Sequence, residues 1–142
     1  MYFLSPRSLR CTGLVFTVCT LLAGCSGTPE DQPDTASVKG LVVMEGEPIE
    51  GAVVTFAPEA GRPSTGITNS QGIFELAYNP TTKGAKIGKH TVRISTARYV
   101  ENPDGTTTEM KEVIPAKYNE SSSLTVEVKP GENDFPFKLD KE

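Results

Sequence analysis

The chain has 142 residues, a net charge of −4 and one histidine. This length corresponds to a single domain, and the acidic charge excludes electrostatic attraction to nucleic acid or to anionic lipid. One histidine also excludes a zinc site built from several histidines, and it restricts any Ser–His catalytic pair to the surroundings of residue 90.

The first 24 residues have the pattern of a secretory signal peptide. Arg7 and Arg10 precede an apolar run over residues 11–23, which is shorter than the roughly 20 apolar residues of a membrane-spanning helix. The run ends in the letters L-A-G-C at positions 22–25, and this motif resembles the lipobox of bacterial lipoprotein signal peptides. The resemblance implies that Cys25 becomes the lipid-modified first residue and that acyl chains such as palmitate anchor the protein to the membrane.

Cleavage before Cys25 would leave 118 of the 142 residues and, by removing two arginines, would change the net charge from −4 to −6. The mature chain would have no second cysteine and therefore no internal disulfide. Residues 25–36 are small, Pro-rich and acidic, so we expect a flexible tether. In well-studied diderm bacteria, an Asp directly after the lipidated cysteine keeps a lipoprotein in the inner membrane, and this chain has Ser26 at that position. We therefore predict a lipid-anchored, extracytoplasmic location in the bacterial cell envelope, at the outer membrane.

From residue 37 onward, short apolar segments alternate with turns rich in Gly, Pro and Asn, without helical periodicity. Apolar residues recur at every second position within these segments, as in strands that bury one face. The predicted strands are residues 38–43, 52–57, 65–68, 73–77, 89–97, 124–129 and 134–139. The predicted turns and loops are residues 44–51, 69–72, 79–88, 102–105 and 130–133, and residues 106–112 are interpreted as a polar, solvent-facing ribbon.

About seven short strands separated by turns predict an all-β domain, an antiparallel β-sandwich. Phe74 and Ile94 are expected to face the core, and Ile114 and Tyr118 to pack against its edge. Pro136 lacks an N–H for a sheet ladder, so the last strand is expected at a sheet edge.

Several of these segments resemble the carboxypeptidase regulatory-like domain. They are V-K-G-L-V from residue 38, G-E-P-I-E-G-A-V-V-T-F-A-P from residue 46, T-N-S-Q-G-I-F-E-L from residue 68 and G-K-H-T-V-R-I from residue 88. The later segments at 114–119 and 123–135 are similar to versions found in small bacterial lipoproteins of planctomycete-like type. The resemblance covers about residues 37–139. It implies a transthyretin-like (prealbumin-like), Ig-like sandwich over residues 37–142, and its motifs concern turns and core positions rather than catalysis.

Catalytic relatives of this sandwich require residues that the chain lacks. A transthyretin-like hydrolase would need several His and Arg residues and a C-terminal Tyr-Arg-Gly-Ser, and an iron dioxygenase would need two His and two Tyr ligands. The chain has only His90 and ends in Leu-Asp-Lys-Glu. We predict no catalytic residue, no cofactor and no metal, and we interpret His90 as an exposed or hydrogen-bonded residue at the start of a strand.

Two groups of acidic residues are weak candidates for calcium, which takes about six or more oxygen ligands. One is Glu45, Glu47 and Glu50 around a turn, and the other is Glu101, Asn102 and Asp104. A solvated acidic loop is the favoured interpretation of both.

The collagen-adhesin B-type relatives of this sandwich contain an intramolecular Lys–Asn isopeptide bond next to a buried acid. Lys39, Asn133 and Glu75 are the obvious trio in this chain. Gly40 follows Lys39 directly, and Asn133 falls in a predicted turn, so the bond is not expected.

Tyr78, Tyr99 and Tyr118 lie near predicted strand ends or loops, where an aromatic ring could stack on a sugar. Edge tyrosines with a buried ring and a wet hydroxyl are the alternative interpretation. The leading functional hypothesis is a membrane-anchored, non-catalytic interaction or structural module whose partner is a protein or a surface polysaccharide. The second hypothesis is a carbohydrate-binding module of the cell surface that uses these tyrosines.

Overall fold

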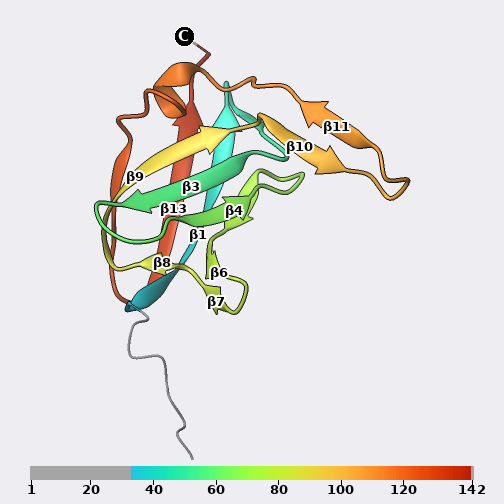
Figure 1. Cartoon of the computed structure of the whole chain (residues 1–142). Coiled ribbons are helices and arrows are strands. Elements are labelled where there is room, and N and C mark those ends of the chain that lie inside the picture. The colour runs from blue at the N-terminus through green and yellow to red at the C-terminus, as the bar shows by residue number, and fades with distance from the viewer. Residues whose placement is uncertain (1–32, 142) are drawn as a thin grey trace, which may run out of the picture. The chain divides into compact units, whose positions relative to one another are not determined.

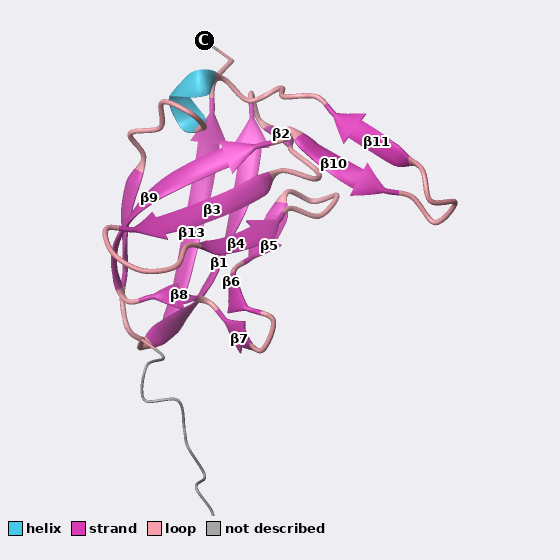
Figure 2. Cartoon of the chain, viewed as in Figure 1, coloured by secondary structure: helices cyan, strands magenta, loops and turns pink. Residues whose placement is uncertain are grey.

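The computed structural model describes residues 33–141, so Cys25 and the predicted signal peptide lie outside the described residues. Apart from one short 3-10 helix, η1 (Ala116–Tyr118), all regular secondary structure of the described part is strand, and loops connect the strands (Figure 2). The strands are β1 (Thr35–Met44), β2 (Glu47–Pro48), β3 (Val53–Pro58), β4 (Ser64–Ile67), β5 (Ile73–Glu75), β6 (Ala77–Asn79), β7 (Thr82–Lys83), β8 (Ala85–Lys86), β9 (Gly88–Ser95), β10 (Arg98–Glu101), β11 (Thr107–Met110), β12 (Thr125–Val128) and β13 (Glu132–Leu139). None of the described residues belongs to a helix with the length and apolar character that a membrane crossing requires.

Two sheets form the layers of a β-sandwich, which confirms the predicted fold class. One sheet has the order β13-β1-β2, with β5 and β8 also paired to β1, and the other has the order β12-β9-β3-β4-β6-β7. Figure 1 shows β1 and β13 crossing behind β3, β4 and β9. A third unit of sheet, β10 with β11, projects from the sandwich as a two-stranded ribbon (Figure 1).

β1 is the strand around which the first sheet is built. Every second residue is buried along its length, as expected for a strand with one face in the core. The strand begins at Thr35, two residues before the predicted domain start, because Thr35 and Ala36 pair with Lys86 and Ala85 of β8. Local composition could not reveal this pairing, since β8 is only two residues long and lies in the predicted loop over residues 79–88.

β1 and β13 pair in parallel, with Val38 opposite Asn133 and Met44 opposite Leu139. An antiparallel arrangement was expected throughout, but side-chain alternation has the same period in both kinds of pairing and does not distinguish them. Pro136 lies on β13, whose neighbour in the sheet order is β1 alone, so its predicted edge position is confirmed.

Aromatic rings fill the space between the two sheets. Phe56 of β3 lies at the centre, with no exposed surface and with its ring centroid 5.6 Å from that of Phe135, 6.2 Å from that of Phe137 and 6.4 Å from that of Phe74. Gly40 on β1 makes this packing possible, because a Cβ there would lie 2.1 Å from the Phe135 carbonyl oxygen and 2.7 Å from the Phe74 ring. The predicted inward positions Phe74 and Ile94 are both buried.

Tight turns lie at the predicted positions 69–72 and 102–105, whereas the predicted turn 44–51 and the predicted loop 79–88 also contain the short strands β2, β7 and β8. In the turn at 69–72, the Asn69 side-chain oxygen accepts hydrogen bonds from the N–H groups of Gln71 and Ile73, at 2.9 and 3.0 Å. The β1–β2 connection has positive φ at both Glu45 and Gly46, at 54° and 84°. This conformation matches the twist of a two-residue hairpin, and glycine adopts it without steric cost.

The last strand begins earlier than expected, at Glu132, which places Asn133 in a strand rather than in a turn. The Asn133 amide donates to the backbone carbonyls of Ser37 and Lys129 and accepts from the Lys129 N–H. The side chain thereby links the 129–132 turn to β1, and it is buried because these backbone groups surround it.

The sandwich has two distinct ends along β1, whose ten residues span about 33 Å. Thr35 and β8 lie at one end. The other end contains Met44, β2 and the base of the β10–β11 ribbon. The Arg98 guanidinium packs on Gly51 there, and a Cβ added at Gly51 would lie 3.0 Å from Arg98 Nη2. Figure 1 shows the ribbon projecting at the end opposite to the start of β1.

Candidate functional site

His90 is the natural starting point for a site, because it is the chain's one histidine. The alternation of β9 places it on the same inward face as Val92 and Ile94, and it is 2% exposed. Its Nε2 lies 2.6 Å from the carbonyl oxygen of Lys86. The predicted hydrogen bond is therefore confirmed, whereas the exposed alternative is wrong because the inward face of β9 already begins at this residue.

The hydrogen bond fixes the role of each ring nitrogen of His90. A carbonyl oxygen only accepts, so Nε2 carries the proton and donates it to Lys86, which leaves Nδ1 as an acceptor in the neutral ring. Within the described residues, Nδ1 is buried and has no hydrogen-bond partner. The Phe56 ring packs on the imidazole with centroids 5.8 Å apart, so His90 acts as a core residue.

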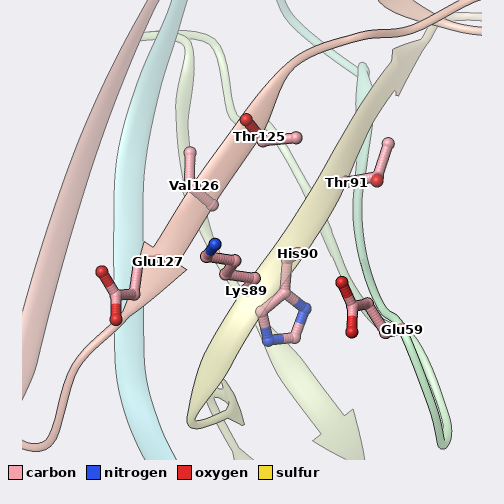
Figure 3. A pocket seen from close by; sticks show the side chains of 7 residues that line it. All are labelled: Glu59, Lys89, His90, Thr91, Thr125, Val126 and Glu127. Atoms are coloured by element: carbon pink, nitrogen blue, oxygen red, sulfur yellow. The ribbon is translucent and has the colours of Figure 1, made fainter.

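A shallow hollow of about 380 Å³ lies over this part of the sheet (Figure 3). The side chains around it come from β9, β12 and the loop after β3: Glu59, Lys89, His90, Thr91, Thr125, Val126 and Glu127. Figure 3 shows the imidazole between the side chains of Lys89 and Glu59. Because Nδ1 is buried, the polar groups accessible in the hollow are the exposed Glu59, Lys89 and Glu127 side chains and two threonines. Among the described residues, neither threonine hydroxyl of this hollow is hydrogen-bonded to one of its carboxylates.

Glu112 is the most highly hydrogen-bonded side chain at the base of the ribbon. Its carboxylate accepts from the Ser95 hydroxyl at 2.5 Å, from the Thr96 N–H and hydroxyl at 3.0 Å each, and from the Ile114 N–H at 2.9 Å. Burial raises the pKa of Glu112, but these hydrogen bonds outweigh burial and hold the pKa below its ordinary value. Glu112 also borders a hollow of about 480 Å³ on the outer face of β3 and β9, beside Arg93.

The two acidic groups face solvent or accept hydrogen bonds from backbone N–H and hydroxyl groups, and Glu45 Oε1 accepts from the Lys141 N–H at 3.1 Å. Glu45, Glu47 and Glu50 are all exposed. Asp104 accepts from the Thr106 N–H at 2.9 Å and from its hydroxyl at 2.6 Å, and these bonds lower the pKa of Asp104. Among residues 33–141, no three His, Cys, Asp or Glu side chains are grouped so that they could hold a metal ion.

The three members of the suggested isopeptide trio are held apart. Lys39 is exposed, and Glu75 forms an exposed ion pair with Lys83, with 3.0 Å between Nζ and Oε2. Asn133 instead points inward and is hydrogen-bonded to Ser37 and Lys129. The arrangement needed for an isopeptide bond, an inward lysine beside asparagine and a buried acid, is therefore not present in this trio.

The three candidate tyrosines occupy three separate places, on β6, β10 and η1 (Figure 1). Tyr78 is half-buried beside a hollow of about 430 Å³ that also includes Arg62 and Asn79. Tyr118 packs against the core, as predicted, and its hydroxyl accepts from the Asp140 N–H at 3.2 Å. Tyr99 stands 74% exposed on the ribbon. The structure therefore brings no two of them together as a stacking platform.

The β10–β11 ribbon, which we call the arm, was only partly expected from the sequence. Residues 106–112 were interpreted as a polar ribbon, but β10 (Arg98–Glu101) was not predicted as its partner. The pairs Arg98–Met110, Tyr99–Glu109, Val100–Thr108 and Glu101–Thr107 define the arm's register. The signal was present in the N-P-D-G turn at 102–105, which separates two segments of equal length.

The sequence matches no known family profile, and no relative was found among curated proteins. Three of the solved structures that resemble the chain illustrate the likeness. The major pilin subunit BcpA of Bacillus cereus is 14% identical with a TM-score of 0.47, and the match covers 78% of this chain and 31% of the pilin. A 9R-lipoxygenase from Cyanothece is 16% identical with a TM-score of 0.43, covering 78% of this chain and 17% of the lipoxygenase. A DUF3823 family protein from Parabacteroides merdae is 12% identical with a TM-score of 0.41, covering 76% of this chain and 47% of that protein. The chain thus spans less than half the length of each.

Proposed function

We propose that the protein is a lipid-anchored, non-catalytic β-sandwich of the bacterial cell envelope, and that it binds a protein or a surface polymer through the end that carries the arm. The arm is the observation that carries this proposal. It is an ordered two-stranded ribbon outside the sandwich, with a tyrosine 74% exposed on it. A sandwich that needed only to fold would gain nothing from such a projection, whereas binding surfaces are commonly placed on projections from rigid scaffolds.

Three hydrogen-bonded polar side chains, two of them buried and Glu112 exposed, support a non-catalytic role. The Nε2–H group of His90 donates a hydrogen bond to the backbone carbonyl oxygen of Lys86. Asn133 joins a turn to β1, and Glu112 joins the arm to β9. Each of these side chains stabilises a junction between strands. A hydrolytic site would instead require a nucleophile next to the base and an accessible cleft.

Anchoring through Cys25 supports a particular orientation. Cys25 precedes the first residue of β1 by ten positions, so lipidation there would hold the Thr35 end of the sandwich nearest to the membrane. The arm lies at the other end of β1 and would face away from the lipid (Figure 1). We propose that the membrane and the partner are bound at opposite ends of the domain.

We also propose that the domain is of the carboxypeptidase regulatory-like type. Support comes from the segments that carry the resemblance, which form core strands and turns: residues 46–58 include β2 and β3, and residues 68–76 include the Asn69 turn and β5. Such motifs concern fold rather than activity, so any regulatory effect would act on catalytic residues outside this sandwich.

Membrane fractionation of the Cys25→Ala variant tests the anchor. We expect the wild-type protein in the membrane fraction with incorporated labelled palmitate, and the variant in the soluble fraction without label. Cys19→Ala, a cysteine change inside the predicted signal peptide, is the matched control and should remain in the membrane fraction. Retention of Cys25→Ala in the membrane would contradict the anchor.

A carbohydrate-binding module remains the second candidate, and the hollow beside Tyr78 favours it over the other tyrosines. This hollow of about 430 Å³ places the half-buried ring next to Arg62, Thr65 and Asn79, and an aromatic face beside polar groups suits a sugar. Binding to a glycan array that disappears in Tyr78→Ala but persists in Tyr118→Ala would support this function.

A further inference from the structure

One face of the arm collects a tyrosine and two carboxylates. Side chains alternate along a strand, and directly opposite residues share a face. The pairs Tyr99–Glu109 and Glu101–Thr107 are separated by one intervening pair, so these four residues project on the same side. We call this set, Tyr99, Glu101, Thr107 and Glu109, the Tyr99 face.

The Tyr99 face is the open side of the arm. Tyr99 and Glu101 are exposed, whereas Arg98 and Val100, on the opposite side of the same strand, are half-buried. Thr107 and Glu109 are exposed as well. Both sides of β11 are exposed, so the difference between the two sides of the arm comes from β10, which turns Arg98 and Val100 partly toward neighbouring residues and presents the Tyr99 ring to solvent. Tyrosine is among the residues enriched at the energetic centres of protein interfaces.

Charge identifies the kind of partner. Tyr99 is flanked by Glu109 across the ribbon and by Glu101 along its own strand, and the face contains no basic residue. An aromatic ring attracts a cation placed over its face, and carboxylates on two sides favour the same positive group. Each attraction alone is weak when exposed, so the combination is what selects the ligand.

We propose that the Tyr99 face binds a segment of a partner protein that carries lysine or arginine, with one cationic side chain over the Tyr99 ring and between the two carboxylates. This inference deepens the proposed interaction function by naming its surface and the chemistry of its partner. It does not depend on the lipid anchor. An isolated two-stranded ribbon is only marginally stable in water, and a bound extended segment would add contacts to it.

Peptide binding to the full mature chain in detergent micelles tests the proposal. The probes are an acetylated hexa-arginine peptide and its neutral hexa-citrulline counterpart, which has nearly the same shape without the charge. We expect the chain to bind the arginine peptide at least about tenfold more tightly, and to lose this preference between about 20 and about 300 mM salt.

Variants locate the binding to the face. Tyr99→Leu keeps a bulky apolar strand residue and should weaken arginine-peptide binding by about tenfold, whereas Tyr99→Phe keeps the ring and should bind within about twofold of wild type. The double variant Glu101→Gln/Glu109→Gln should weaken binding and its salt dependence. The matched control, Glu45→Gln/Glu47→Gln, makes the same change of net charge outside the face and should bind within about twofold of wild type.

Several outcomes would overturn the proposal. Equal losses of arginine-peptide affinity in the two double variants would mean that the peptide is attracted to the acidic protein in general. Unchanged peptide binding in Tyr99→Leu would show that the Tyr99 ring does not take part in binding. Equal binding of the citrulline peptide would point to hydrogen bonding, as with a sugar. A Tyr99-dependent change in sedimentation without peptide would identify a second copy of the chain as the occupant.

Crosslinking in native membranes separates this inference from the interaction function itself. If wild type and Tyr99→Leu capture the same protein equally, the interaction function stands and the Tyr99 face is wrong. If wild type captures a protein that Tyr99→Leu loses, both are supported. Circular dichroism of each variant confirms that the sandwich is folded.

Discussion

The sandwich and the arm place an aromatic residue at the middle of a strand in opposite surroundings. Phe56 of β3 has no exposed surface and packs against several other rings, whereas Tyr99 of β10 is 74% exposed. Both positions obey the same side-chain alternation. The difference arises because β3 has a second sheet facing it and β10 does not, so alternation determines which residues share a face but not whether that face is buried.

The two regions also differ in what holds them in place. The sandwich depends on apolar burial between its sheets. The arm depends on polar contacts in its turn, where the Asn102 amide donates to the Thr106 and Thr108 hydroxyls and Asp104 accepts from Thr106. Glu112 then ties the end of the arm to Ser95 and Thr96. We expect the arm to open locally at a much lower free energy than the sandwich.

The largest effect is expected for Phe56→Ala in the sandwich. Removing a fully buried ring from this cluster leaves a cavity and should lower the free energy of unfolding by about 3–5 kcal/mol. Urea denaturation followed by circular dichroism measures the change. A loss below about 1 kcal/mol would mean that the aromatic cluster is not the centre of the core.

A smaller loss is expected for Gly40→Ala, which adds one methyl group where β1 approaches β13. The new Cβ would meet the Phe135 carbonyl oxygen and the Phe74 ring, and overpacking of this kind costs about 1–3 kcal/mol. The neighbouring exposed residue supplies the control, because Lys39→Ala on the same strand should change the free energy of unfolding by less than about 0.5 kcal/mol. Equal effects of the two substitutions would show that β1 and β13 are less closely packed than described.

The sequence allowed the sandwich to be predicted better than the arm, for a physical reason. Buried strands such as β3 and β9 carry alternating apolar residues because a core selects them, and the inward positions of Phe74 and Ile94 were predicted correctly. The arm packs against no core that would select such a pattern, so only the turn after β10 could indicate from the sequence that a strand precedes it. The parallel partner of β1 and the burial of Asn133 were missed as well. Both depend on contacts between residues far apart in the chain, such as the hydrogen bond between Asn133 and Ser37, which are 96 positions apart.

The candidate site was predictable only as separate residues. The sequence identified Tyr78, Tyr99 and Tyr118 but could not show that β6, β10 and η1 place them apart. The grouping of Tyr99 with Glu101 and Glu109 follows from the strand register, and no spacing in the chain encodes it. His90 illustrates the converse, because its neighbours Gly88 and Lys89 suggested an exposed strand end while its alternation with Val92 placed it in the core.

Glu112 joins the two regions, and Glu112→Gln should lower the free energy of unfolding by about 0.5–1.5 kcal/mol near neutral pH. The folded-state pKa of Glu112 lies below its ordinary value because of the hydrogen bonds from Ser95, Thr96 and Ile114, which outweigh the effect of burial. A lowered pKa means that the carboxylate stabilises the fold above the ordinary glutamate range and that this stabilisation is lost as pH falls through the folded-state pKa.

The difference in unfolding free energy between wild type and Glu112→Gln should therefore be largest near about pH 7 and should shrink toward about pH 3. Amide hydrogen exchange supplies a local measurement, since Val113 and Ile114, next to the lost contacts, should exchange faster in the variant. A difference that stays constant with pH would show that the charge of Glu112 does not contribute to the junction.

The smallest effect on stability is expected for Tyr99→Ala, and this substitution tests the contrast with Phe56 most directly. Both changes remove an aromatic ring from a strand, but the Tyr99 ring is 74% exposed and leaves no cavity, so the free energy of unfolding should change by less than about 0.5 kcal/mol. Urea denaturation under the conditions used for Phe56→Ala gives the comparison. A loss above about 1 kcal/mol would mean that the ring packs against the sandwich in solution. A negligible loss would leave the ring without a role in folding, as expected for a side chain whose contacts are made with a partner.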